Sequence, residues 1–153
     1  MTCCTIFKTE FVIILVISMK IVISTDTKIE KSQVLALYKA NNWSSAEKPT
    51  ELYNGLMNSH SLVTAWNKDQ LVGLGNAISD GYLMVYYPHL LVLPEYQGKG
   101  IGELIVNKMQ ERYAGFHMQM LTADEKAIDF YKKMGFKKAG NTEPMWIYKG
   151  NEH

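Results

Sequence analysis

Three glycines fall within five positions of the stretch QGKGIG, residues 97–102, and this spacing suggests anion-binding chemistry. The stretch follows an apolar run and leads into the helix-like sequence ELIVNKMQERY. At a helix N-terminus the first backbone N–H groups lack partners within the helix, and the helix dipole is positive there. Glycines remove the side chains that would keep an anion away, and Lys99 adds a cation beside them. The stretch therefore predicts a phosphate-binding loop built from main chain.

The same glycines are compatible with two alternatives, which the spacing and the position of the stretch disfavour. The spacing matches neither G-x-G-x-x-G nor G-x-x-x-x-G-K-[ST], so it disfavours a dinucleotide-binding or Walker-type loop. A tight turn without a ligand would also use glycine, since glycine adopts unusual backbone conformations readily. The position between a strand and a helix favours the ligand-binding loop over such a turn.

The elements that must hold this loop follow from hydrophobic periodicity and turn residues. Alternation and β-branched content predict strands at 20–25, 61–67, 71–79, 82–93, 117–121, 136–140 and 145–150. Apolar spacing of three and four residues predicts helices at 29–41, 49–58, 103–113 and 124–134. Asp124 should cap the start of the last helix, and Gly135 its end. Pro88 lies inside the longest strand and cannot donate to a ladder, so we expect a bulge or a split between neighbouring strands there.

The order of these elements predicts the fold class. Helices separate the strands of the second half, which implies crossover connections and some parallel pairing. The strands at 61–67 and 71–79 are joined by the short turn KDQ and should form an antiparallel hairpin. We therefore expect an α/β chain with a mixed sheet, in which the strand at 82–93 lies beside the strand at 117–121.

Length and charge narrow the class of partners. The chain has 153 residues, 47% of them hydrophobic, which suits a single domain with a substantial core. Sixteen basic and fifteen acidic residues leave a formal charge of +1, so neither nucleic acid nor an anionic membrane is an expected partner. The only cysteines, Cys3 and Cys4, are adjacent, and we expect neither a disulfide framework nor a metal site.

The N-terminal region contains an apolar stretch at 11–19, between Lys8 and Lys20. It is shorter than the roughly 20 apolar residues that span a bilayer, and no small-x-small cleavage site follows it. We therefore expect residues 1–18 to be an extension, rather than a signal peptide or a membrane anchor, and residues 19–153 to form one domain. The lack of thiols after the first few residues is compatible with a reducing cytosol and also with a cysteine-free extracellular domain, and of the two we expect a cytoplasmic protein.

Two blocks of the sequence resemble the GNAT superfamily of acyl-CoA-dependent N-acetyltransferases. Gln97-x-x-Gly100-x-Gly102, after VLPEY, resembles the family signature [Q/R]-x-x-G-x-[G/A]. AIDFYKKMGF, at 127–136, resembles the family helix with A-x-x-F-Y-x-x-x-G-F. The resemblance implies an α/β GNAT fold with a mixed central sheet of about six or seven strands and four helices, splayed at the acetyl-CoA cleft.

The resemblance also implies roles for the matching residues. The loop would bind the coenzyme A pyrophosphate through main chain at Gln97, Gly98, Lys99, Gly100, Ile101 and Gly102. The preceding strand would pair with the pantetheine arm and polarise the thioester carbonyl at Leu90, Leu91 and Val92. Tyr131 stands at the family's general-acid position, and a phenol with a pKa of about 10 is protonated at neutral pH. Without the motif, a tyrosine at this point of an amphipathic helix would be expected in the core.

The group that deprotonates the acceptor is not evident from the sequence. Some members of the family place a glutamate or histidine on the long strand, at positions that hold Tyr86 and Pro88 here. His89 follows directly, but strand alternation turns it to the opposite face unless the bulge rotates it. The candidates are therefore His89 and a water relay, and we favour the water relay.

The acceptor pocket should be walled by the helix pair at 29–59 and by strand residues, namely Tyr82, Met84, Tyr86 and Trp66. Such a weakly charged, aromatic wall suits a small amine. The expected function is transfer of an acetyl group from acetyl-CoA to the primary amine of a small molecule, by direct attack through a ternary complex. The alternatives are acetylation of a protein lysine or N-terminus, and a non-catalytic acyl-CoA sensor. No metal is expected, and a homodimer is left open.

Overall fold

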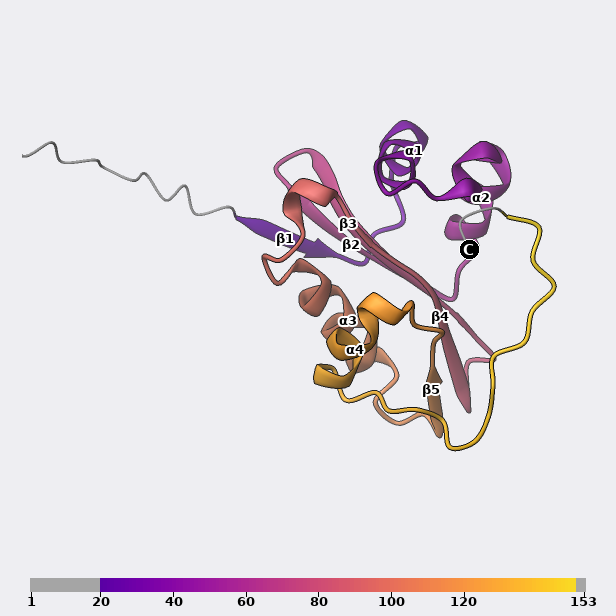
Figure 1. Cartoon of the computed structure of the whole chain (residues 1–153). Coiled ribbons are helices and arrows are strands. Elements are labelled where there is room, and N and C mark those ends of the chain that lie inside the picture. Colours follow the sequence, from indigo (N-terminus) through magenta and orange to yellow (C-terminus); the bar gives the residue numbers. More distant parts are fainter. Residues whose placement is uncertain (1–19, 151–153) are drawn as a thin grey trace, which may run out of the picture.

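The computed structural model describes residues 20–150, which form a five-stranded sheet with helices on both faces (Figure 1). The strands are β1 (Ile21–Ser24), β2 (Ser61–Asn67), β3 (Gln70–Ser79), β4 (Met84–Val92) and β5 (Met118–Met120). They lie in sequence order, with β1 to β4 antiparallel and β4 parallel to β5. The expected α/β class, the mixed sheet and the pairing of β4 with β5 are confirmed.

Helices and short 3-10 turns connect these strands. The α-helices of the described residues are α1 (Lys31–Ala40), α2 (Pro49–Met57), α3 (Ile101–Arg112) and α4 (Ile128–Lys133). The 3-10 turns are η1 (Ser44–Glu47), η2 (Pro94–Tyr96) and η3 (Glu125–Ala127). Figure 1 shows α1 and α2 on one face of the sheet and α3 and α4 on the other, so the core lies in two layers around the strands.

Close packing of α3 on β3 decides where the glycine loop lies. A Cβ atom on Gly75 would come within 2.7 Å of Met109 Sδ and 2.8 Å of Ile105 Cγ2. Both side chains are buried, so a larger residue at this position would force α3 away from the sheet. A Cβ atom on Gly73 would come within 3.0 Å of Ile105 Cδ1 and of the Leu91 carbonyl oxygen, and would lie 3.4 Å from Cγ2 of Ile101, the first residue of α3. The two glycines therefore hold the start of α3, and the loop before it, against the sheet.

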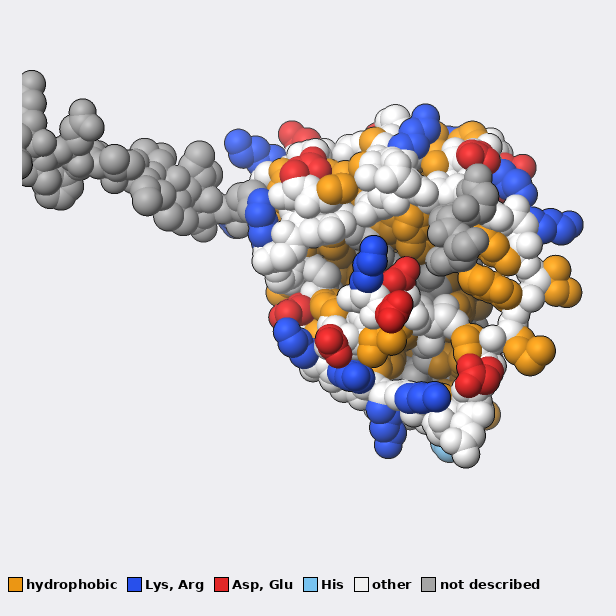
Figure 2. All heavy atoms as spheres, viewed as in Figure 1, with side chains coloured by type: hydrophobic (Ala, Val, Ile, Leu, Met, Phe, Trp, Pro, Cys, Tyr) orange, Lys and Arg blue, Asp and Glu red, His pale blue; other side chains and the backbone are white. Residues whose placement is uncertain are grey.

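The sheet has five strands rather than the expected six or seven, because the two predicted C-terminal strands are not formed within the described residues. The segment after α4 pairs with no strand up to residue 150, and Met145 and Ile147 are 94% and 98% exposed. Figure 2 shows hydrophobic side chains standing out at this side of the surface. A strand needs a partner edge, and β5 offers only three residues, so apolar alternation alone does not produce strands here.

The single helix expected at 124–134 is divided into η3 and α4. The Asp124 carboxylate accepts a hydrogen bond from the Lys126 N–H at 3.0 Å and so caps η3. Gly135 follows α4 with a φ of 89°, in the left-handed region that suits glycine after a helix. The cap roles that the sequence predicts for Asp124 and Gly135 are therefore confirmed.

Two expectations for the N-terminal region concern residues outside the described range, namely the extension at 1–18 and the apolar stretch at 11–19. The strand expected from residue 20 is present as β1, which pairs with β2 at the edge of the sheet. Between residues 20 and 150, no helix has both the length and the apolar character needed to cross a membrane.

Candidate active site

β4 carries a bulge where the sequence predicts one. Asn76 of β3 pairs with His89, and Ile78 of β3 pairs with Tyr86. One residue of β3 therefore opposes two residues of β4, and the second of these is Pro88. Because proline has no N–H to donate, the extra residue falls where the ladder would lack a hydrogen bond in any case.

The bulge puts His89 on the same face of the sheet as Tyr86. Asn76 and Ile78 are two residues apart on β3, so they point to one face, and their antiparallel partners share it. His89 and Tyr86 therefore share this face although they are three residues apart. The face is the one covered by α1, because His89 contacts Tyr38 of that helix. The alternation that would turn His89 to the opposite face is overridden by the bulge.

β4 and β5 pair only briefly and then separate. The paired residues of β4 run from Met84 to Tyr86, whereas the strand continues to Val92. The Tyr86 hydroxyl lies 3.0 Å from Thr122 Oγ1, just after β5, and this contact joins the two sides where they diverge. Within residues 20–150 the rest of this edge of β4 is unpaired, and the result is a split between two parallel strands of the kind expected from the sequence.

Main-chain groups of β4 point into this split at alternate residues. The Leu93 N–H donates to the Val72 carbonyl of β3 at 2.8 Å. Hydrogen-bonding groups alternate along an antiparallel strand, so Leu91 also directs its main-chain groups at β3. Leu90 and Val92 direct theirs away from β3, into the split. Leu90 and Val92, two of the three strand residues predicted to contact a coenzyme, thus direct their main-chain groups into the split, whereas Leu91 does not.

The glycine loop lies at the open end of the split, directly after β4. Gly98 and Gly100 have φ values of 71° and 80°, in the left-handed region that other residues rarely adopt. A Cβ atom at either position would meet nothing within 4 Å, so the loop presents bare main chain outward. α3 begins at Ile101 without a side-chain cap, and the N–H groups at 98–103 have no acceptor among the described residues. The loop therefore offers an array of unpaired donors at a helix N-terminus.

Two other residues of the motif hold the loop in place. The Gln97 side-chain amide donates to the Val92 carbonyl at 3.0 Å and to Asn41 Oδ1 at 3.3 Å, which ties the loop to β4 and to the end of α1. A Cβ atom on Gly102 would lie 3.4 Å from the Phe130 ring, so this glycine allows α4 to approach α3. Gln97 and Gly102 thus support the loop from its two ends.

Lys99 folds back over η2. Its Nζ donates to the Glu95 carbonyl at 2.7 Å and lies 5.3 Å from the centroid of the Tyr96 ring. The lysine is exposed, and cation–π contacts at exposed sites are weak. The ammonium group can therefore turn toward an anion in the loop at little cost.

Tyr131 lies in a small pocket between β4, α3 and α4. The pocket is also lined by Tyr87, His89, Leu90, Val106, Met109 and Leu121. Burial, together with the nearby Tyr86 phenol, raises the pKa of Tyr131 to about 12. The hydroxyl is therefore protonated throughout the physiological range and can donate a proton. Edge-on contacts with Phe130 and Phe136, at centroid distances of 5.0 and 5.9 Å, hold the ring.

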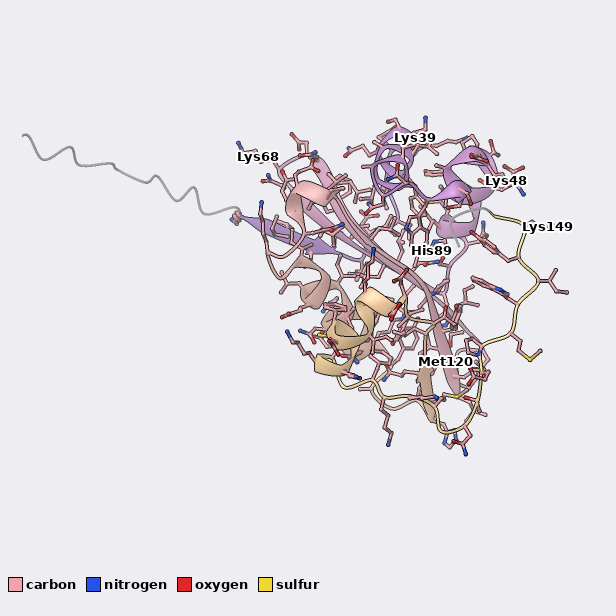
Figure 3. All side chains as sticks on the ribbon, viewed as in Figure 1. Lys39, Lys48, Lys68, His89, Met120 and Lys149 are labelled. Carbon is pink, nitrogen blue, oxygen red and sulfur yellow. The ribbon has the colours of Figure 1, made fainter. Side chains whose placement is uncertain are left out.

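His89 is held by two aromatic side chains from the region of α1. Its Nδ1 lies 2.6 Å from the Tyr38 hydroxyl oxygen, and the Trp43 ring packs edge-on at a centroid distance of 5.0 Å. Figure 3 shows His89 in the interior, between β4 and the helices α1 and α2. Burial lowers the pKa of His89 to about 4, so the ring is neutral at physiological pH. Sequence reasoning missed Tyr38 as a neighbour of the site, because helical periodicity marks it only as a core position.

The expected acceptor wall is brought together only in part. Met84 and Tyr86 are half-buried on β4, and Tyr82 is 84% exposed in the turn before it. Trp66 is on β2 and pairs with Leu71 near the start of β3, whereas Tyr86 pairs near the end of β3. The expectation that Trp66 joins this wall is therefore wrong, because β3 separates it from β4 and it lies toward the other end of the sheet.

The side chains that line the pocket around Tyr131 are uncharged, because burial keeps the Tyr131 phenol protonated and the His89 ring neutral. Asp80, in the turn before β4, accepts hydrogen bonds from the N–H groups of Tyr82, Leu83 and Met84, which hold the pKa of its carboxyl below the usual value. This carboxylate therefore stabilises the turn and is not part of the pocket around Tyr131.

Within the described residues, no three or more His, Cys, Asp or Glu side chains are grouped so that they could hold a metal ion. The inner part of the split instead presents the Tyr131 phenol and the neutral His89 imidazole beside the free edge of β4.

Comparisons with known proteins agree with this geometry. Residues 26–145 match the family model of the acetyltransferase (GNAT) domain. The fold is similar to that of a GNAT-family acetyltransferase from Streptococcus pneumoniae TIGR4, with a TM-score of 0.73 and 29% identity, over 85% of this chain and 99% of that chain. The resemblance that the sequence motifs indicate is therefore confirmed.

Curated relatives match over shorter segments. An uncharacterized N-acetyltransferase of Pyropia yezoensis is 30% identical over 89 residues, which are 54% of this chain and 51% of the relative. A peptidyl-lysine N-acetyltransferase of Salmonella typhimurium is 32% identical over 66 residues, 41% of this chain and 46% of the relative. The chain thus matches about half the length of these relatives. Because the family model matches most of its residues, the chain belongs to the GNAT acetyltransferase family.

Proposed function

We propose that this GNAT protein transfers an acetyl group from acetyl-CoA to the primary amine of a small molecule, by direct attack in a ternary complex. The observation that carries the proposal is the split between β4 and β5, which has the glycine loop at its open end and Tyr131 in its wall. A coenzyme with phosphates at one end and a thioester at the other suits a site of this shape.

The loop residues fit the pyrophosphate of coenzyme A. Gly98 and Gly100 leave the main chain bare, and the N–H groups at 98–103 need acceptors. Lys99 can add its ammonium group from η2. In this proposal the pantetheine arm runs along the free edge of β4, where Leu90 and Val92 direct their main-chain groups, while Leu91 contributes by packing.

The residues of the split also fit the chemistry of acyl transfer. Acetyl-CoA supplies a thioester, and the acceptor amine forms the C–N bond to its carbonyl carbon as the C–S bond breaks. The Leu90 N–H would stabilise the negative charge that develops on the carbonyl oxygen. Tyr131 lines the same pocket as Leu90, and it would donate its proton to the departing thiolate. The proton of the amine passes to water.

A small amine is favoured as acceptor by the wall beside the split. Tyr82, Met84 and Tyr86 offer aromatic and apolar surface without charge, which suits an arylalkylamine or an amino-acid-like amine.

A protein lysine is the second candidate for the acceptor. It is favoured by the relative named a peptidyl-lysine N-acetyltransferase, and by Met118 and Met120 of β5, which are 42% and 39% exposed and extend the wall.

Product analysis with a panel of amines tests this function. The full chain would be incubated with acetyl-CoA and arylalkylamines, amino-acid amides, simple alkylamines or a lysine-containing peptide. We expect an acetylated small amine by mass spectrometry, with release of one thiol per product. Acetylation of the peptide alone would favour the second candidate. Coenzyme binding without any product would favour the acyl-CoA sensor, and failure to bind acetyl-CoA in calorimetry would overturn the proposal.

A further inference from the structure

His89 and Tyr38 form a hydrogen bond that the proposed acetyl transfer does not use. Tyr38 is a fully buried residue of α1, and its hydroxyl oxygen lies 2.6 Å from His89 Nδ1. The two residues are 51 positions apart in the sequence. The bond therefore joins α1 to β4 directly after the bulge, on the face that also carries Tyr86.

Burial decides which of the two atoms donates. Burial raises the pKa of Tyr38, so the phenol keeps its proton, and within the described residues His89 Nδ1 is its only hydrogen-bond partner. If Nδ1 carried a proton and donated it, the phenol O–H would be left in the interior without an acceptor, which is unfavourable. Tyr38 therefore donates and Nδ1 accepts. In a neutral imidazole the single proton is then on Nε2.

The Nε2 atom keeps access to the site. Within the described residues Nε2 has no hydrogen-bond partner, and it is not fully buried, unlike the unpartnered atoms Ser45 Oγ and Asn76 Oδ1. His89 is partly exposed and lines the same pocket as Tyr131. The ring thus offers one N–H donor toward the split, and its other nitrogen is occupied.

We infer that His89 binds the acyl acceptor as a neutral Nε2–H donor instead of deprotonating it, and that Tyr38 is the positioning residue that fixes this tautomer. The matching group on the acceptor is an oxygen close to the reactive amine, such as the carbonyl oxygen of an amino-acid amide. This inference rests on the proposed acetyl transfer to a small amine, and it narrows the substrate to amines with such an oxygen. Trp43 supports the arrangement, because its edge-on contact restrains the imidazole ring.

Kinetics with three variants separate a donor from a base. In His89→Gln the amide N–H replaces the Nε2 donor but offers no basic nitrogen, whereas His89→Ala removes both. With an amino-acid amide as acceptor, we expect His89→Ala to raise KM by about 3- to 10-fold and to leave kcat within a few-fold. His89→Gln should recover part of this loss. His117→Ala, at an exposed histidine, is the matched control and should change neither parameter.

The acceptor oxygen gives a second comparison. With an alkylamine of the same length that lacks this oxygen, His89→Ala should change KM little, because the lost hydrogen bond has no counterpart. A fall in kcat of about 10²- to 10⁴-fold in both His89→Ala and His89→Gln would make His89 the general base and overturn the inference. Equal KM effects on both amines would also overturn it.

The tautomer can be observed without turnover. In two-bond ¹H–¹⁵N correlation spectra of the full chain, we expect His89 to be protonated at Nε2, and Tyr38→Phe to populate the Nδ1–H form. An Nδ1–H tautomer in the unsubstituted protein would overturn the inference. If no amine is acetylated, the proposed function fails, whereas acceptor affinity measured by calorimetry with coenzyme A present still tests the role of His89.

Discussion

The two ends of the β4–β5 split are built in different ways. The open end is a loop of consecutive residues at 97–102, and its binding groups are main-chain N–H groups whose directions follow from the φ angles of Gly98 and Gly100. The inner end, near the bulge, gathers the side chains of Tyr131, His89 and Tyr38 from α4, β4 and α1. The first depends on local backbone conformation and the second on register and packing. We therefore expect changes in the loop to act on coenzyme binding, and changes at the inner end to act on turnover at Tyr131 and on acceptor binding at His89.

The largest effect should come from Gly100→Glu in the loop. The substitution places a side chain at a φ of 80° and a carboxylate where phosphate is expected, so it combines strain with like-charge repulsion. We expect the affinity for acetyl-CoA to fall by about 1,000-fold or more, roughly 4 kcal/mol, in isothermal titration calorimetry. Gly115→Glu is the matched control, because Gly115 lies after α3, away from the loop, and a Cβ atom there meets nothing within 4 Å. Equal affinity in both variants would show that the loop does not bind the coenzyme.

At the inner end, Tyr131→Phe keeps the ring and its contacts with Phe130 and Phe136 and removes the hydroxyl. If Tyr131 protonates the thiolate, kcat should fall by about 100-fold while the affinity for acetyl-CoA stays similar. The acid must be protonated to act, so the rate is lost as pH rises through its pKa of about 12. A stopped-flow pH profile should therefore show no loss at pH 10, where an ordinary phenol is half ionised. Near-normal turnover of the phenylalanine variant would return Tyr131 to a packing role.

The support of the loop by the sheet can be tested with Gly75→Ala. The added Cβ would come within 2.7 Å of Met109 Sδ, and overpacking of this kind costs about 1–3 kcal/mol of unfolding free energy. Gly55→Ala on α2 is the matched control, since a Cβ atom there meets nothing within 4 Å and the helix should gain about 0.5–1 kcal/mol. Urea denaturation of both variants measures the difference. Equal stabilities would mean that α3 can move away from β3 freely.

The smallest effect is expected for a chain that starts at Met19. No residue of the loop or of the inner end precedes Met19, and β1 begins at Ile21. Such a chain should keep the acetyl-CoA affinity and the turnover of the full chain within about two-fold, well below the tenfold that corresponds to 1.4 kcal/mol. Calorimetry and thiol release would measure both quantities. Loss of either one would assign residues 1–18 a part in the domain.

Predictions from the sequence were accurate where a residue type restricts the backbone. Proline at 88 cannot join a ladder, and the bulge is present at that position. Asp124 and Gly135 cap their helices as expected. The prediction of two C-terminal strands was wrong for the described residues. Apolar residues such as Met145 and Ile147 favour a strand, but no strand edge lies beside them to pair with. Strand formation depends on a neighbour, and the sequence of the segment does not contain that neighbour.

By itself, the sequence of this protein determined the glycine loop, the family and the placement of Tyr131 on the last helix, because these features lie in short, contiguous motifs. Only the tertiary structure decided which way His89 faces, since one extra residue in β4 reverses the alternation of every side chain after it. The contact of His89 with Tyr38, and the separation of Trp66 from the acceptor wall, likewise depend on how distant segments align. Main-chain sites are encoded locally, whereas the side chains of the inner end acquire their roles from register.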